Sequence, residues 1–274
     1  VNAGNSITSG GNYNVTVGDE AGAAVSTGIQ NTLIGALAGD ALTDADKNVA
    51  IGYGALTTDT LGSRSVAIGT FALEDQNFTS ATDAYNVAVG NAAGANVTTG
   101  TMNTLIGGLA GDAITTGQYN VAIGVDALSV EDTASKSVAV GTSALAVQNA
   151  GTVDAYNVAV GHNSGVNVTT GVNNTLIGGL AGDALTTGSL SVAVGYHALG
   201  AEDTGGRNVA VGYEALAAQN SDTTNYNTAV GFNSGVSVTT GIQNTIIGGL
   251  AGTQGTDLTT GNNNILLGYL TGTS

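Results

Sequence analysis

A five-residue motif, Asn or Ser followed by three residues and then Gly, recurs along the chain with a spacing of 17 residues. Longer intervals of 19 to 21 residues follow the fourth, eighth and twelfth copies, and an interval of 20 residues precedes the last copy. Such a period indicates stacked repeat units, and 17 residues are too few for a unit of two helices. The copies begin at Asn14, Asn31, Asn48, Ser65, Asn86, Asn103, Asn120, Ser137, Asn157, Asn174, Ser191, Asn208, Asn227, Asn244 and Asn264.

Each unit reads as one coil of a β-solenoid. The three residues inside the motif are β-formers such as Val-Ala-Ile or Thr-Leu-Ile, and Gly ends each run. A small residue always follows three positions after that Gly, and a second short segment such as "NVTT" at 96–99 precedes the next motif. The sequence therefore predicts an all-β, parallel β-solenoid of about fifteen coils, each with two short strands and two glycine turns, as a single domain over 1–274.

The motif Gly and Asn are interpreted as structural residues. Gly allows a positive φ or a close approach of two backbones, and Asn hydrogen-bonds to nearby backbone and can form ladders in a stack. The glycine-rich stretch "NTLIGGLAGDALTTG" at 174–188 lacks the Lys and Ser or Thr of a phosphate-binding loop. It also lacks the apolar 20-residue segment of a membrane helix contact.

The motif strand is apolar on both faces, which favours an oligomer. Its third residue is always Val, Ile or Leu and is expected to line the inside of the coil. Its middle residue, which is Ala, Leu or Ile in all copies but the first, then points outward. A strand that is apolar on both faces is typical of strands that are buried on both faces. Identical chains arranged around an axis would cover the outer face. The alternative is a single solenoid with a mildly apolar wall of Ala.

Composition limits the classes of function. The chain carries 4 Lys and Arg against 20 Asp and Glu, for a formal net charge of −16. This argues against binding nucleic acid or anionic lipid. The sequence contains no run of eighteen apolar residues, so no segment is predicted to span a membrane as a helix. The absence of Cys excludes disulfides and thiolate metal sites. The chain starts at Val1 and is interpreted as a processed protein or part of a longer one.

No catalytic or metal-binding pattern emerges, so the chain is predicted not to be an enzyme and to need no cofactor. His162 and His197 occupy different positions in their coils, and a zinc site needs three or four convergent ligands. The segment 43–47, "TDADK", lacks the Gly and final Glu of a calcium loop. Adjacent acids recur at 74–75, 131–132 and 202–203. A solvated acidic face is favoured there, and weak calcium binding is left open.

An ice-binding solenoid needs a long ladder of Thr. The Thr pairs at 98–99 and 115–116 stack for two coils, but the next coil has Glu131-Asp132 at these positions. The broken ladder disfavours this function.

Two further sets of residues are candidates for binding. All four basic residues, and several Tyr, immediately precede a motif, while other Tyr lie five residues after a motif start. Both positions flank the motif strand, so these side chains are candidate contacts between chains: Lys47, Arg64, Lys136, Arg207, Tyr53, Tyr85, Tyr119, Tyr156, Tyr196, Tyr213 and Tyr226. The longer intervals predict loops that extend from one edge, with candidate receptor-binding residues Asp75, Gln76, Asn77, Phe78, Gln148, Asn149, Gln219 and Asn220.

The motifs resemble those of a known group of repeat proteins. "NVAIG", "SVAIG" and "SVAVG" are similar to head repeats of YadA-like trimeric autotransporter adhesins. "NTAVG", "NVAVGYEAL" and "TTGNNNILLG" resemble Asn-Thr-Ala-Ile/Val-Gly arrays of bacteriophage tail fibres. The resemblance covers roughly residues 12–272. It implies a left-handed β-roll, a homotrimer, an extracellular location on a virion or cell surface, and attachment to a glycan or protein receptor. A self-assembling structural filament without a receptor is the alternative function.

Overall fold

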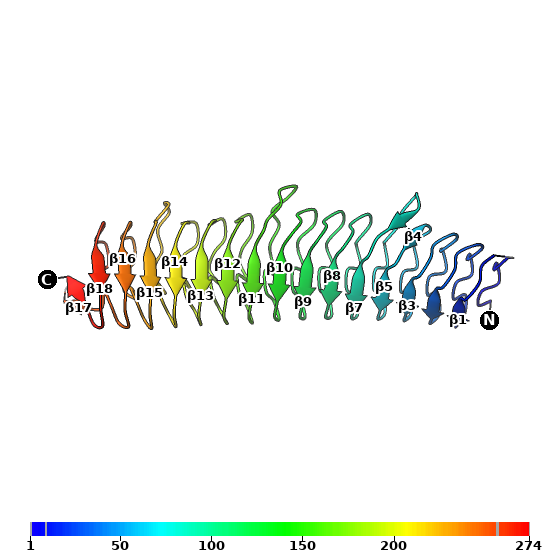
Figure 1. Cartoon of the computed structure of the whole chain (residues 1–274), viewed down its shortest axis with the longest axis horizontal. Helices are drawn as coiled ribbons and strands as arrows, with labels where there is room; N and C mark the ends of the chain where they lie inside the picture. Colours follow the sequence, from blue (N-terminus) through cyan, green and yellow to red (C-terminus); the bar gives the residue numbers. More distant parts are fainter. Residues whose placement is uncertain (1, 9, 256–257, 274) are drawn as a thin grey trace. The chain divides into compact units, whose positions relative to one another are not determined.

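The computed structural model describes residues 2–8, 10–255 and 258–273. The described residues contain fifteen three-residue strands, one in each coil, and no helix, which confirms an all-β, parallel β-solenoid with coils about 17 residues apart (Figure 1). A coil here runs from one motif start to the residue before the next. The strands are β1 (Val15–Val17), β2 (Thr32–Ile34), β3 (Val49–Ile51), β5 (Val66–Ile68), β7 (Val87–Val89), β8 (Thr104–Ile106), β9 (Val121–Ile123), β10 (Val138–Val140), β11 (Val158–Val160), β12 (Thr175–Ile177), β13 (Val192–Val194), β14 (Val209–Val211), β15 (Thr228–Val230), β16 (Thr245–Ile247) and β18 (Ile265–Leu267).

The chain divides into two compact units, residues 1–136 and 137–274. The first unit contains β1 to β9 and the second contains β10 to β19. Within each unit every coil strand pairs in parallel with the next one, and equivalent residues face each other, as Val15 faces Thr32 and Val192 faces Val209. The repeat therefore sets the register of the stack directly.

The predicted second strand of each coil is mostly absent. Among the described residues it appears only as two-residue strands, β4 (Gly62–Ser63) paired with β6 (Thr82–Asp83) and β17 (Gln254–Gly255) paired with β19 (Gly272–Thr273). Elsewhere this side of the coil bends, although its backbone still bonds to the next coil: Thr98 N–H donates to Thr115 O at 2.9 Å. The chain bends before and after this segment of the coil, so too few residues are extended in it to form a regular second strand.

The motif glycines have the close-approach role that the sequence indicated. All fifteen have a φ between +125° and +146°. A Cβ added to Gly107 would lie 2.4 Å from the carbonyl oxygen of Gly124 in the next coil. Successive turns therefore stack backbone against backbone, at a separation that only Gly permits.

The motif Asn residues form a ladder at the corner before each strand. Asn103 is buried, and its Nδ2 donates to Gly117 O at 2.9 Å while its Oδ1 accepts the N–H of Asn120 at 3.0 Å. The left-handed residue at this corner is not the Asn itself but the residue before it. All fifteen such residues have a φ between +50° and +66°, and none is Gly.

The prediction of which strand face lines the interior was wrong. In β2 to β16 the middle residue of each coil strand is buried, as at Ala50 and Leu105, whereas the first and third residues are partly or largely exposed. The sequence held a signal for this arrangement. The middle residue and the residue six positions later are never both large in the same coil.

The core follows a four-coil pattern of complementary sizes. Where the middle strand residue is Leu, the residue six positions later is Gly, as in Leu105 with Gly111. Where the middle residue is Ala in the two following coils, that residue is Leu, as in Ala122 with Leu128. A Cβ on Gly111 would lie 2.7 Å from Leu105 Cδ2. The two residues are therefore never both large in one coil, and the coils with Ala and Gly at these positions, such as Ala88 and Gly94, are filled by Leu73 and Leu105 of the neighbouring coils.

Candidate functional site

The outward face of the coil strands is a largely apolar surface in each unit. We call it the strand face: the first and third strand residues of each coil, which are all Val, Ile, Leu or Thr. The residue before the motif and the residue five positions after the motif start flank it. Ile177 and Ile247 on this face are 39% and 37% exposed. The outward face is therefore formed by other residues than the Ala, Leu and Ile that had been expected there.

Aromatic side chains flank the strands along this face. The rings of Tyr196 and Tyr213 stack with centroids 5.4 Å apart, and those of Tyr213 and Phe232 with centroids 5.3 Å apart. The rings thus form a short ladder on neighbouring coils. The seven tyrosines singled out from the sequence are between 44% and 52% exposed: Tyr53, Tyr85, Tyr119, Tyr156, Tyr196, Tyr213 and Tyr226.

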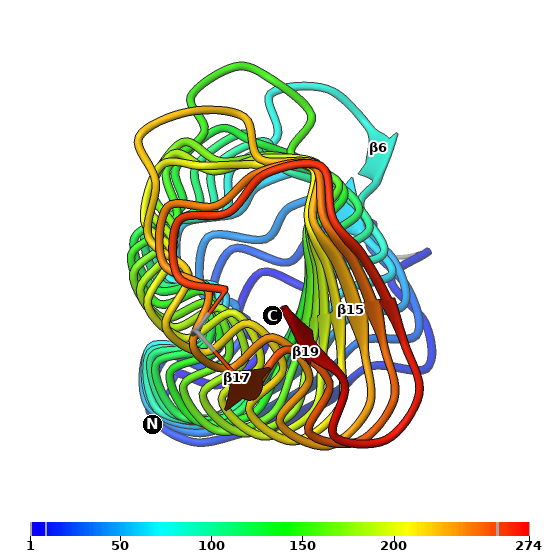
Figure 2. The same ribbon diagram turned by 90° about the vertical axis from the view of Figure 1, so that its left-hand side faces the viewer.

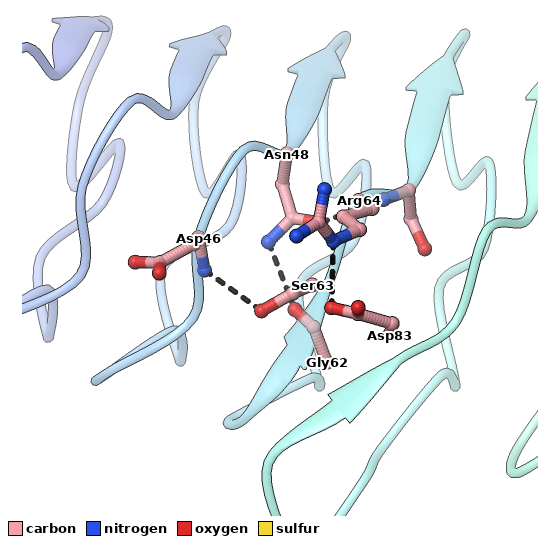
Figure 3. Close-up of polar contacts among 7 residues, drawn as sticks. Asp46, Asn48, Gly62, Ser63, Arg64 and Asp83 are labelled. Atoms are coloured by element: carbon pink, nitrogen blue, oxygen red, sulfur yellow. Dashed lines mark hydrogen bonds and ion pairs between the residues drawn. The ribbon is translucent and has the colours of Figure 1, made fainter.

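Basic residues stand at the edge of the strand face, and Arg64 has a carboxylate partner in its own chain. Its Nε lies 2.8 Å from Asp83 Oδ1 (Figure 3). Its guanidinium group also lies over the ring of Tyr85 at 5.6 Å. The hydrogen bond to Asp83 raises the pKa of Arg64. Arg207 lies over Tyr226 at 5.6 Å in the same way. Lys47 is exposed and Lys136 half-buried.

The longer intervals form loops, which we call insertions, at 76–85, 148–156 and 219–226. In the first unit, the insertion returns through β6, which pairs with β4 of the preceding coil. In the second unit, the insertions after β10 and β14 extend from the same edge of the coils, as predicted (Figures 1 and 2).

Four of the candidate receptor residues are buried and hold the insertions in place. Gln76, Gln148 and Gln219 are fully buried, and Phe78 is 6% exposed. Gln148 bridges two motif starts, because its Nε2 donates to Ser137 Oγ at 2.9 Å and its Oε1 accepts from Asn157 Nδ2 at 2.8 Å. The glutamines thus complete the corner ladder beside the insertions. The accessible candidates are Asp75, Asn77, Asn149 and Asn220.

The expectation of a solvated acidic face was wrong for two of the three acid pairs. Glu131 and Glu202 are fully buried, and Asp59 is buried at the same position of an earlier coil. Each accepts backbone N–H groups from its own coil, such as Gly62 N–H to Asp59 Oδ1 at 3.0 Å. In the sequence, a Glu followed directly by an Asp gives no indication that the Glu side chain points inward.

The two histidines do not form a site together. His197 Nε2 lies 4.0 Å from Asp183 Oδ1 of the preceding coil. Burial raises the pKa of Asp183, and the nearby His197 partly opposes this. Within residues 2–8, 10–255 and 258–273, no group of three or more acidic or His side chains could hold a metal ion, and no pocket is found.

Comparisons with known proteins place the chain in no family: no family model, curated protein or solved structure matches it. The fold itself defines the chain as a β-solenoid repeat protein. The described residues hold no helix that is long and apolar enough to cross a bilayer.

We expect the tips of the insertions to be dispensable for folding. Removing residues 152 and 153 deletes exposed residues of the tip but keeps the buried Gln148 and the Tyr156 that precedes the next motif. The melting temperature should change by no more than about 2 °C, since exposed loop residues contribute little to stability. Thermal unfolding monitored by circular dichroism would measure this. Loss of the folded signal would show that the tip is part of the core.

Proposed function

We propose that the chain is part of an extracellular attachment fibre that assembles as a homotrimer through the strand face, with the insertions contacting a receptor. The main support is the exposed apolar strand face. In the second unit it runs over eight strands about 4.8 Å apart, which gives roughly 30 Å of length and on the order of 500 Å² of area. A patch of this size is at the upper end of what a monomer exposes, and such patches mark interaction sites.

The distribution of charge agrees with an interface between copies. The four basic residues all border the strand face, and the 20 acidic residues give the chain a large excess of negative charge. Apolar contact therefore has to outweigh like-charge repulsion, and the tyrosines beside the strands supply a large contact area with a polar tip. The resemblance of the motifs to those of trimeric adhesins and tail fibres favours three chains over two.

Charged substitutions on the strand face test the assembly. The wild-type chain of 26.6 kDa should scatter light as a species three times that mass. A variant with Ile177→Glu and Ile247→Glu should lose at least about 100-fold in association constant, because two charges would be buried without partners.

A matched control adds the same charge elsewhere. Thr187 and Thr240 are exposed and lie outside the strand face, in the tenth and thirteenth coils. Thr187→Glu with Thr240→Glu should therefore assemble as the wild type does. A monomeric wild-type chain, or equal loss of assembly in both variants, would contradict the proposed interface.

Attachment is tested separately from assembly. Labelled wild-type protein and the variant lacking residues 152 and 153 would be compared on a glycan array and on intact bacterial cells. Binding that weakens when the tip is removed would support a receptor contact at the insertions. An assembled oligomer that binds neither surface would instead favour the structural filament.

A further inference from the structure

Glu202 connects one coil to both ends of the next insertion. The residue lies between β13 and β14 and is fully buried. Its Oε1 accepts the N–H of Gly205 at 2.8 Å and that of Ser221 at 3.4 Å. Its Oε2 accepts from Asn225 Nδ2 at 2.5 Å. Ser221 lies near the start of the insertion 219–226 and Asn225 lies near its end. One carboxyl group therefore holds both ends of this insertion.

The surroundings of this contact are built to accommodate it. A Cβ added to Gly205 would lie 2.5 Å from Glu202 Oε1 and 2.6 Å from Asn225 Nδ2, so only Gly leaves room for the pair. Asn225 is itself fully buried, and its backbone N–H donates to Gly206 O at 3.1 Å. Between the two fixed ends, residues 222–224 are exposed.

The same arrangement occurs at the insertion of the first unit. Asp59 occupies the position of Glu202 in its coil. Its Oδ1 accepts the N–H of Phe78 at 3.1 Å, and its Oδ2 accepts from Gln76 Nε2 at 2.6 Å. Phe78 and Ser221 both lie two residues after the buried Gln of their insertions. A buried acid therefore precedes each of these insertions and bonds to the same point of the loop.

The burial of Glu202 bears on its protonation state. The side chain is fully buried, and none of the groups that donate to it is positively charged. Protonation removes an ionised group from this buried site. A neutral carboxyl group still accepts through its carbonyl oxygen, so the hydrogen bonds from Gly205 and Ser221 to Oε1 are kept.

We propose that Glu202 is the positioning residue of the insertion 219–226, and that it holds this loop more firmly when its carboxyl group is neutral than when it is ionised. The exposed residues 222–224 are then presented in one conformation, which becomes better ordered in mildly acidic surroundings. The proposal concerns the order of the loop and not attachment, so its test does not depend on the proposed function.

The sign of the pH dependence follows from the pKa. Burial is the largest influence and raises the pKa of Glu202 above its ordinary value of 4.5, and repulsion from Asp203 acts in the same direction. Hydrogen bonds from Gly205, Ser221 and Asn225 lower it by less. From the coil of the insertion, Glu202 is thus faced by the uncharged Ser221 and Asn225.

The closed loop binds the proton more tightly than an open, solvated loop does. Acidification therefore favours the closed loop. The equilibrium constant for closing the loop falls as the pH rises from about 4.5 through the raised pKa of Glu202. It falls by up to about tenfold for each unit by which that pKa is raised.

Hydrogen exchange of the insertion tests the proposal. Protection factors for Ser221 and Asn225 N–H, corrected for intrinsic exchange, would be compared at pH values of about 4.5 and 7. We expect higher protection at the lower pH in the wild type. Glu202→Gln should give the acidic level at both pH values, because Gln is neutral at both and keeps the Oε1 acceptor for Gly205 and Ser221. Glu202→Ala should lose the protection at both, while the insertion 148–156 stays unchanged as the internal control.

Two results would overturn the proposal. If protection in Glu202→Ala equals that of the wild type, Glu202 does not position the loop. If wild-type protection is independent of pH or falls with acid, the preference for the neutral form is wrong. Should Glu202→Ala fail to fold, the comparison of the wild type with Glu202→Gln still decides between these outcomes, because a merely structural role would not make the pH profile flat in the Gln variant alone.

Discussion

Gly107→Ala should destabilise the solenoid by about 3 kcal/mol or more, although it adds a single methyl group. Gly107 has a φ of +136°, a region that is accessible essentially only to Gly. Its Cβ would also lie 2.4 Å from a carbonyl oxygen of the next coil, whose backbone would have to move away. The shift would break parallel strand pairing on both sides. The urea concentration at the unfolding midpoint would measure the loss.

The next residue in the chain provides a matched control. At Gly108 the φ is not positive, and a Cβ would approach no atom closer than 4.0 Å. Gly108→Ala should therefore change the free energy of unfolding by less than about 0.5 kcal/mol. Equal effects of the two substitutions would show that the glycine turn is not the close-approach point of the stack.

Leu105→Ala should lower the free energy of unfolding by about 2–5 kcal/mol, and a second substitution should restore part of that loss. Leu105 is fully buried and fills the space beside Gly94 and Gly111. The next two coils have Ala at the middle strand position and Leu six positions later, as at Ala122 and Leu128. Leu105→Ala with Gly111→Leu therefore converts one pattern into the other. The backbone allows it, since Gly111 has a φ of +57° and Leu128 has one of +54°.

The double-mutant cycle gives a sharp outcome. Gly111→Leu alone should be destabilising by about 1–3 kcal/mol or more because it overfills the space that Leu105 occupies. The double variant should be more stable than Leu105→Ala, with a coupling energy of about 1 kcal/mol or more in the favourable direction. Ile114, close to the added side chain, limits the recovery. Additive losses would contradict the size complementarity of the core.

Much of the fold was predictable because the repeat has a constant spacing and a constant motif. A motif such as Asn103 to Gly107 repeats with one spacing, so strand positions, parallel register and glycine turns follow from it. The inward face did not follow, because Val and Ile outside and Ala inside reverse the usual order of hydrophobic sizes. The interior holds at most one large side chain of a coil at this level, so Ala can be the inward residue in one coil while Leu105 occupies the same position in another.

The candidate site was predictable only in outline. The positions of Arg64 and of the tyrosines beside the strands could be read from their fixed place in the repeat, but the in-chain partner Asp83 belongs to an insertion that has no repeat to align it. The inward turn of Glu202 was hidden for a related reason. An acid next to another acid reads as surface, and only the tertiary structure shows the N–H groups that make burial acceptable.

The left-handed residues before the motifs have a consequence for the length of the array. Each costs roughly 1 kcal/mol relative to an ordinary backbone conformation, and this cost is the same in every coil. The hydrogen bonds that offset it are shared between neighbours, so an inner coil has two stacking interfaces and a terminal coil has one. Stability should therefore grow with the number of coils, opening should begin at the ends, and a few isolated coils should not fold.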